Sequence, residues 1–106
     1  MDDDAVVVAD RQGVIRLWSA GAERMFGYPA SESLGRTLDL IIPAEYREAH
    51  WNGFRRAIAS GQTPAEGTVL SFPAQHSSGD VIERSGRLTL IRRPRNDVIA
   101  AIMVFE

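Results

Sequence analysis

His50 is the residue of this chain with the most specific chemical potential. An imidazole can bind a metal ion or a ligand, and it gains a proton near neutral pH. The segment that starts at Pro43 has helical periodicity, and on such a helix His50 shares one face with Tyr46, Gly53, Phe54 and Ala57. Gly53 and Ala57 are small, so they leave room for a flat ligand beside the imidazole. The alternative is a structural histidine on an apolar helix face.

The remaining polar residues form no catalytic arrangement. His76 lies in a predicted turn between polar residues, where a solvated imidazole is expected. Arg92, Arg93 and Arg95 flank another turn without aromatic residues between them, so we expect no direct contact with nucleic acid. The acidic run at 2–4 is expected to be a solvated terminus. The sequence contains no Ser-His-Asp arrangement, phosphate-binding glycine loop or metal-spaced cluster, and we therefore expect no enzyme activity.

Length and composition fit a single small domain. The chain has 106 residues, is 44% hydrophobic and 25% charged, and carries a net charge of -2. This charge would not attract nucleic acid or an anionic membrane. The chain has no cysteine, which excludes disulfides and thiolate metal sites and fits a reducing compartment. No run reaches the roughly 18 apolar residues of a membrane span, and the acidic start does not resemble a signal peptide. We therefore expect a cytoplasmic domain that does not bind membranes.

The order of the expected elements gives the fold class. Apolar runs at 5–9 and 14–18 predict two strands joined by a turn that contains Gly13. Helical segments are then predicted from Ser19 to Phe26 with Gly27 after it, at 29–34, and from Pro43 up to Gly61. Three more strands are predicted at 68–72, 81–91 and 98–105. Grouped strands and helices indicate an α+β domain, here a five-stranded antiparallel sheet with several short helices on one face.

Several motifs in this order resemble one known family. They are Gly13-Val14-Ile15, Trp18-Ser19, Ala22 to Tyr28 (AERMFGY), Leu34-Gly35-Arg36 and Ile42 to His50 (IPAEYREAH). Together they resemble the PAS domain family over essentially the whole chain, from Ala5 to Phe105. The segment from Ile42 to His50 is similar to the long helix of PAS domains, including the haem-binding oxygen sensors of the FixL type.

The resemblance implies a sensory role. A ligand, cofactor or redox change in a cavity would alter the sheet, and the sheet would pass the change to a neighbouring domain. Within this role haem is one possible cofactor. His50 matches the axial histidine of the haem sensors, and Arg56 matches an arginine that pairs with a haem propionate. A histidine-ligated haem with an open sixth position would be a gas sensor.

The opposite side of the expected cavity departs from the oxygen sensors. The position of their oxygen-binding arginine falls near Leu70, which donates no hydrogen bond, and Gly86 stands where a bulky apolar residue is expected. With haem bound, this would favour CO, NO or redox sensing; without haem, Gly86 would enlarge an apolar cavity. The strand residues expected to line it are Ile82, Gly86, Leu88 and Leu90. A covalent flavin is excluded because the photoactive relatives react through a cysteine, whereas a non-covalent flavin stays open.

The two terminal strands indicate a partner. Ala5–Ala9 and Val98–Phe105 are apolar at every position, whereas a strand with one solvated face alternates. We therefore expect the outer sheet face to be covered by a flanking helix of a larger protein or by a second copy in a homodimer. The alternative cover is a short N-terminal segment that folds back. The domain is expected to be part of a larger signalling or transcription-regulatory protein, and the competing hypothesis is a ligand-free dimerisation module.

Overall fold

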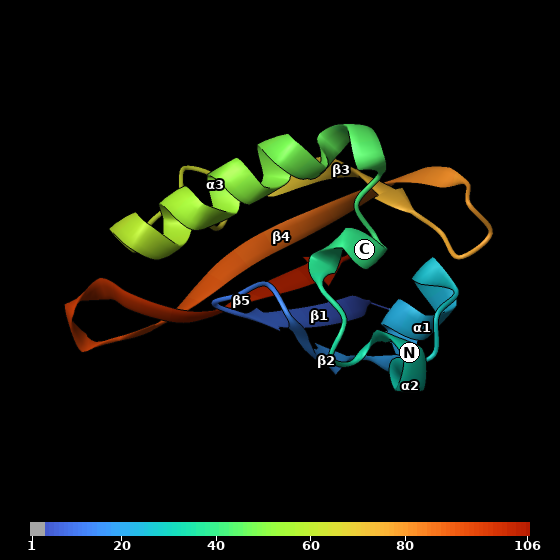
Figure 1. The fold of residues 1–106 in the computed structure, drawn as a ribbon, viewed down its shortest axis with the longest axis horizontal. Helices are drawn as coiled ribbons and strands as arrows, with labels where there is room; N and C mark the ends of the chain where they lie inside the picture. The colour runs from blue at the N-terminus through green and yellow to red at the C-terminus, as the bar shows by residue number, and fades with distance from the viewer. Residues whose placement is uncertain (1–3) are drawn as a thin grey trace.

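A five-stranded antiparallel sheet forms the frame of the molecule (Figure 1). The computed structural model describes residues 4–106, so the acidic run at 2–4 lies outside the described residues apart from Asp4. The strands follow the spatial order β2-β1-β5-β4-β3. They are β1 (Ala5–Asp10), β2 (Ile15–Trp18), β3 (Val69–Gln75), β4 (Val81–Arg93) and β5 (Asp97–Phe105). β5 pairs with β1 at the centre of the sheet and joins the two hairpins, which confirms the predicted fold class.

The helical segments lie between β2 and β3 in the sequence, apart from one short turn. They are α1 (Ala20–Phe26), α2 (Ala30–Ser33), η1 (Leu38–Leu40), η2 (Ala44–Tyr46), α3 (Arg47–Ser60) and η3 (Pro94–Asn96). In Figure 1, α3 runs alongside β4, whereas α1 and α2 lie near β1 and β2. Within residues 4–106, no helix is long and apolar enough to cross a membrane.

Ser19 connects α1 to the sheet. Its hydroxyl oxygen accepts a hydrogen bond from the backbone N–H of Ala22 at 3.1 Å, as an N-cap does, and another from the N–H of Val6 at 2.8 Å. Gly27 ends the helix with φ 83°, and its N–H donates to the Glu23 carbonyl. Both predicted boundaries of this helix are confirmed.

The long helix begins later than predicted. Pro43 has an extended ψ of 145°, and a 3-10 turn follows it before the helix starts at Arg47. Tyr46, at φ -106° and ψ -3°, lies at the junction and is 45% exposed. The prediction that Tyr46 shares the inner helix face with His50 is therefore wrong, because Tyr46 belongs to the preceding turn. The predicted end at Gly61 is confirmed by its φ of 80°.

The turn between β3 and β4 packs against the end of α1. The N–H of Ser77 donates to the Phe26 carbonyl at 2.8 Å. A Cβ on Gly27 would lie 2.2 Å from Ser77 Oγ and 2.7 Å from His76 Cε1. His76 is half-buried, and its Nδ1 accepts from the Ser78 N–H at 3.0 Å. His76 therefore lies in a turn as predicted and is only partly solvated, because the turn folds back onto α1.

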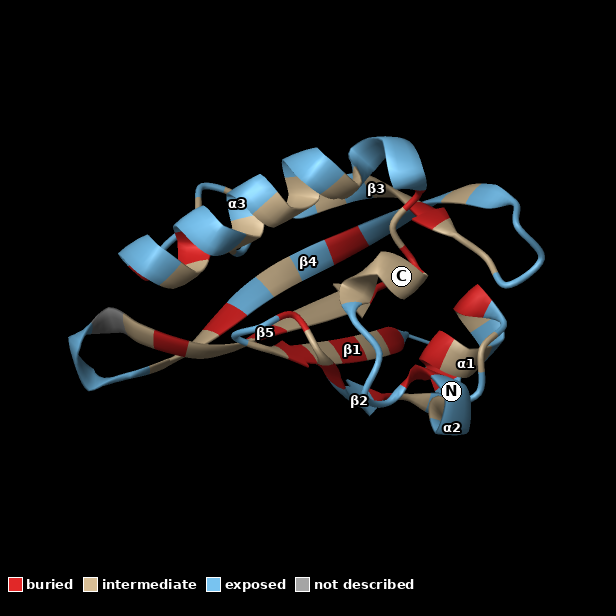
Figure 2. Cartoon of the chain, in the orientation of Figure 1, coloured by how far each residue is buried: buried red, intermediate tan, exposed pale blue. Residues whose placement is uncertain are grey.

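The central strands have one buried and one half-buried face. Ala5, Val7 and Ala9 of β1 point into the core, while Val6 and Val8 between them are half-buried (Figure 2). The register pairs Val6 with Val104 and Val8 with Ile102 of β5, so a strip of large apolar side chains follows the outer face. We call these four residues the outer strip. The unbroken apolar sequence of β1 and β5 therefore corresponds to a core face and to an outer face that the described residues cover only in part.

A candidate ligand-binding cavity between the long helix and the sheet

A cavity of about 290 Å³ lies between α3 and the inner face of the sheet. From α3 it is lined by Ala49, His50, Gly53, Phe54 and Ala57, and from the sheet mainly by Phe72, Leu88, Leu90 and Met103. Leu38, Ile41 and Ile42 close it near η1, and Thr63 and Ala65 close it beyond the end of α3. His50 and Thr63 are the lining side chains, among the described residues, that carry nitrogen or oxygen atoms. The cavity is therefore suited to an apolar ligand with few polar groups.

His50 lies in a largely apolar environment that favours the neutral form of its imidazole. Burial lowers its pKa below the ordinary value of 6.5, and the opposing charge of Asp39 has a weaker effect. Its Nδ1 is buried and has no hydrogen-bond partner among the described residues. Its ring lies edge-on to Trp51 at a centroid distance of 4.7 Å and is tilted against Phe54 at 5.9 Å. Since an unpaired buried polar atom costs free energy, a ligand group that pairs with the ring would be stabilised here.

Trp51 holds the first half of α3 in place. Its Nε1 donates to Asp39 Oδ1 at 2.7 Å. Arg47 supports the same end of the helix, because its Nε donates to the Ile42 carbonyl at 2.9 Å. These contacts join α3 to the segment that contains η1, and so they fix the distance between His50 and the sheet. No sequence pattern predicts these contacts, because Trp51 lies off the apolar helix face and its partner is 12 residues away.

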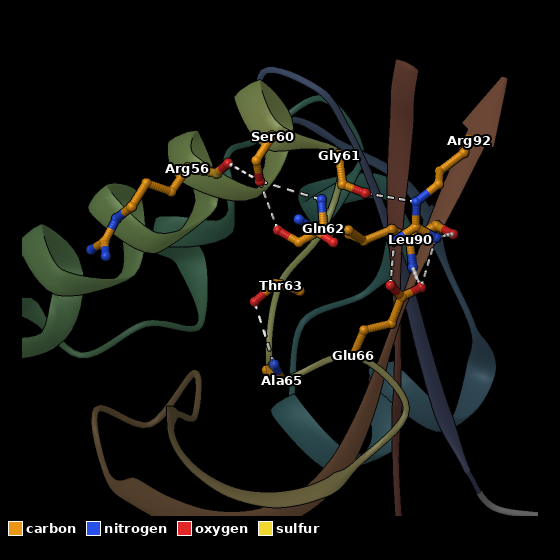
Figure 3. A network of polar contacts seen from close by, with 9 residues as sticks. All are labelled: Arg56, Ser60, Gly61, Gln62, Thr63, Ala65, Glu66, Leu90 and Arg92. Atoms are coloured by element: carbon orange, nitrogen blue, oxygen red, sulfur yellow. Dashed lines mark hydrogen bonds and ion pairs between the residues drawn. The ribbon is translucent and has the colours of Figure 1, made fainter. Parts of the chain in front are cut away.

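The segment at 61–67 closes the far end of the cavity through a polar network with β4 (Figure 3). Arg92 donates from Nε to the Gly61 carbonyl at 2.7 Å and forms an ion pair with Glu66. Glu66 Oε2 accepts from the Leu90 N–H at 2.9 Å and from Arg92 Nη1 at 3.0 Å, and the Gly67 N–H donates to the Leu88 carbonyl at 2.9 Å. The hydrogen bond from Arg92 lowers the pKa of Glu66 below its ordinary value. This segment therefore supplies hydrogen-bond partners for the backbone of the part of β4 that extends beyond β3.

Four of the predicted site residues line the cavity together with His50: Gly53, Ala57, Leu88 and Leu90. Ala57 is buried, whereas Gly53 is exposed and has no atom within 4 Å of a Cβ built on it. Tyr46, Arg56 and Leu70 lie outside the lining. Arg56 is exposed, and its side chain points away from the Glu66–Arg92 network (Figure 3).

Gly86 does not enlarge the cavity. A Cβ at this position would lie 3.0 Å from Phe105 Cδ1 and 3.2 Å from Met103 Cε. The space left by the missing side chain is therefore filled by Phe105, and the prediction of extra room at Gly86 is wrong. Ile82, from the same strand face, packs against the main core instead of the cavity.

The comparison with known families decides the identity of this fold. The family model described as PAS fold matches residues 3–106. The chain belongs to the PAS family. Over 47 residues, this PAS domain is 38% identical to the sensor protein FixL of Bradyrhizobium diazoefficiens, which covers 44% of the chain and 9% of FixL. The predicted resemblance to FixL-type domains is therefore confirmed.

Solved structures agree with this fold over nearly the whole chain. A PAS domain from Colwellia psychrerythraea has a TM-score of 0.83 at 19% identity and covers 99% of this chain and 86% of that one. The PAS domain of the quorum-sensing receptor RpfR from Cronobacter turicensis, solved in complex with BDSF, has a TM-score of 0.77 at 15% identity and covers 99% and 93%. At these identities the likeness establishes the fold alone. The chain spans about a tenth of the length of the curated relatives that it matches.

Proposed function

We propose that this PAS domain senses a small, mainly apolar molecule that binds between α3 and the sheet. The observation that carries the proposal is the cavity of about 290 Å³, whose walls are apolar apart from His50 and Thr63. Cavities for drug-sized ligands start at about 300 Å³, so a ligand at the small end of this class fits. Apolar walls around a void lose packing contacts, and a ligand would restore them.

The ligand is expected to have an apolar body and one polar group. The imidazole of His50 is neutral and can donate or accept a hydrogen bond, and its Nδ1 lacks a partner within the described chain. A carboxyl or hydroxyl group of the ligand would pair with this ring. The RpfR PAS domain was also solved in complex with C12:0 at 15% identity to this chain, which supports a chain-like ligand for this fold.

The signal would leave through the sheet to an attached effector domain of a larger signalling or transcription-regulatory protein in the cytoplasm. A ligand in the cavity contacts Leu88 and Leu90 of β4 directly, and β4 pairs with β5 along most of its length. The outer strip lies on β1 and β5 and is half-buried, which supports a second copy or a flanking helix as its cover. The small share of the curated relatives that the chain spans supports an effector outside it.

Fatty acids of increasing length test the cavity. Octanoic, decanoic and dodecanoic acids would be titrated into a Trp18→Phe background while the fluorescence of Trp51, next to His50, is recorded. We expect a saturable change that is at least about tenfold weaker in Ala57→Leu, because a leucine there fills the cavity. The matched control is Ala59→Leu on the same helix, since Ala59 does not line the cavity. If the wild-type domain binds none of the acids, the ligand-free dimerisation module is the better interpretation.

Haem-based sensing of CO, NO or redox state is a second candidate because of His50. The buried, neutral imidazole is the form that binds iron, so His50 fits as the axial ligand. Bound haem would supply gas binding or electron transfer. Arg56, expected at a propionate, lies outside the cavity lining, and a macrocycle would require α3 to move away from the sheet. Protein mixed with haem would show a Soret band that is lost in His50→Ala and kept in Leu70→Ala; no band at all would retire this candidate.

A further inference from the structure

A second hollow, an open cleft of about 400 Å³, lies beside the second half of α3. Its lining residues are Arg11, Arg55, Ile58, Ala59, Arg95 and Asp97. They come from the turn between β1 and β2, from the second half of α3, from η3 between β4 and β5, and from the start of β5. None of them lines the apolar cavity, so the two hollows share α3 as a wall but no side chain.

Positive charge exceeds negative charge in this cleft. Its lining has three arginines and one carboxylate, and Asp97 already pairs with Arg93 at 2.6 Å and with Arg11 at 3.5 Å. Arg55 donates to the amide oxygen of Asn52 at 2.9 Å, which does not neutralise its charge. Neither Arg55 nor Arg95 forms an ion pair with a carboxylate of the described residues. The cleft therefore holds two guanidinium groups without a counter-charge.

The backbone of Arg95 has a conformation that is uncommon for a residue with a side chain. Arg95 has φ 72° and ψ 26°, the left-handed region that favours glycine or asparagine. Among the described residues, no other non-glycine residue has a positive φ. Such outliers persist where a local strain serves a site. Here the strained residue is one of the two arginines without a carboxylate partner.

We propose that this cleft binds the phosphate group of a small molecule. A guanidinium presents a planar fork of N–H donors that matches phosphate oxygens, and the cleft presents two such forks, from α3 and from η3, to one group. Ile58 and Ala59 add an apolar wall on which an organic part of the molecule can pack. The proposal does not depend on the apolar cavity being a ligand site.

The test is an NMR titration of the protein at physiological salt. ADP, inorganic pyrophosphate and adenosine would be added separately, and the backbone amide and arginine Nε signals followed. Saturable shifts at Arg55, Ile58 and Arg95 with ADP or pyrophosphate are expected, and none with adenosine. Tighter binding of ADP would identify an organic phosphate as the ligand, whereas equal affinities would identify the free anion group.

Two variants separate binding from folding. Arg95→Gly removes one guanidinium and also relieves the strained backbone, so we expect about tenfold weaker binding with an unchanged or higher melting temperature. Arg55→Gln should weaken binding by a similar factor. The control is Arg84→Gln, an exposed residue of β4 opposite Phe72 and outside the cleft. Shifts that do not saturate, equal binding of adenosine, or an equal loss in Arg84→Gln would overturn the proposal.

Discussion

The indole ring of Trp51 fills the space that a side chain at Gly13 would need. A Cβ on Gly13 would lie 2.3 Å from Trp51 Cη2. Because Trp51 directly follows His50 on α3, the turn between β1 and β2 packs against the helix that forms the cavity wall. The position of this helix is thus coupled to the first hairpin of the sheet.

Gly13→Ala is expected to destabilise the protein by more than the strain of a positive φ alone. Gly13 has φ 81°, which costs an alanine about 1 kcal/mol, and the clash with Trp51 adds roughly 1–3 kcal/mol. Gly35→Ala is the matched control, since Gly35 has φ 88° and no atom within 4 Å of a Cβ. Urea unfolding measures both variants. Equal losses would show that Trp51 yields to the new methyl group.

His50 should make stability depend on pH. Burial lowers its pKa below 6.5 in the folded protein, so the unfolded chain binds a proton at a pH where the folded chain does not. Its contribution is complete above about pH 6.5 and is lost as the pH falls below that value, by at most about 1.4 kcal/mol per unit. Urea midpoints in His50→Gln should fall less steeply on acidification. Identical slopes in both proteins would contradict a buried, neutral His50.

Glu66 takes the place of a strand beside the last part of β4. Its side chain accepts from the Leu90 N–H, so Glu66→Ala should make amide hydrogen exchange at Leu90 several-fold faster. Because the pKa of Glu66 is lowered, its carboxylate stays ionised through the ordinary range, and only acidification below about 4.5 should have a similar local effect. Glu83→Ala, which removes an exposed contact with Ser71, is the control. Unchanged exchange at Leu90 would show that another group protects it.

Gly86→Ala tests whether the space beside Gly86 is open or is filled by the ring of Phe105. With open space at this strand position, alanine would stabilise the protein by about 0.5–1 kcal/mol. We expect a loss of about 1–3 kcal/mol instead, because Phe105 lies 3.0 Å from the added Cβ and is held by Phe26 at a centroid distance of 5.2 Å. The double variant with Phe105→Leu should show a smaller effect of the alanine. Thermal and urea unfolding measure the stability of the single and the double variant.

The outer strip should mediate self-association. Ile102 is one of its four residues and is paired with Val8 of β1 on one side and Thr89 of β4 on the other. Ile102→Lys is expected to shift a dimer to the monomer in sedimentation, because a charge would be buried in the contact. Leu34→Lys replaces an apolar residue that is 47% exposed outside the sheet and serves as the control. A wild-type domain that is monomeric at every concentration would leave a flanking helix as the cover.

Local interactions explain what could be predicted. Ser19, Gly27 and Gly61 act within four residues of the helix ends that they define, so the sequence was sufficient to place those ends. The strand positions and the fold class followed from apolar runs and from their order. His50, Gly53, Ala57, Leu88 and Leu90 were found because helical and strand periodicity places them on inner faces.

Only the tertiary structure determined what surrounds those residues. Trp51 reaches Asp39 across 12 positions and Arg92 reaches Glu66 across 26, and no periodicity links such pairs. The role of Gly86 depends on the register that places Phe105 opposite it, and Tyr46 was misplaced because Pro43 begins a separate turn. The sequence by itself determined a PAS sheet with a histidine on its long helix. The cavity and the cationic cleft depend on how the helix docks, since docking is decided by contacts between residues that are distant in the chain.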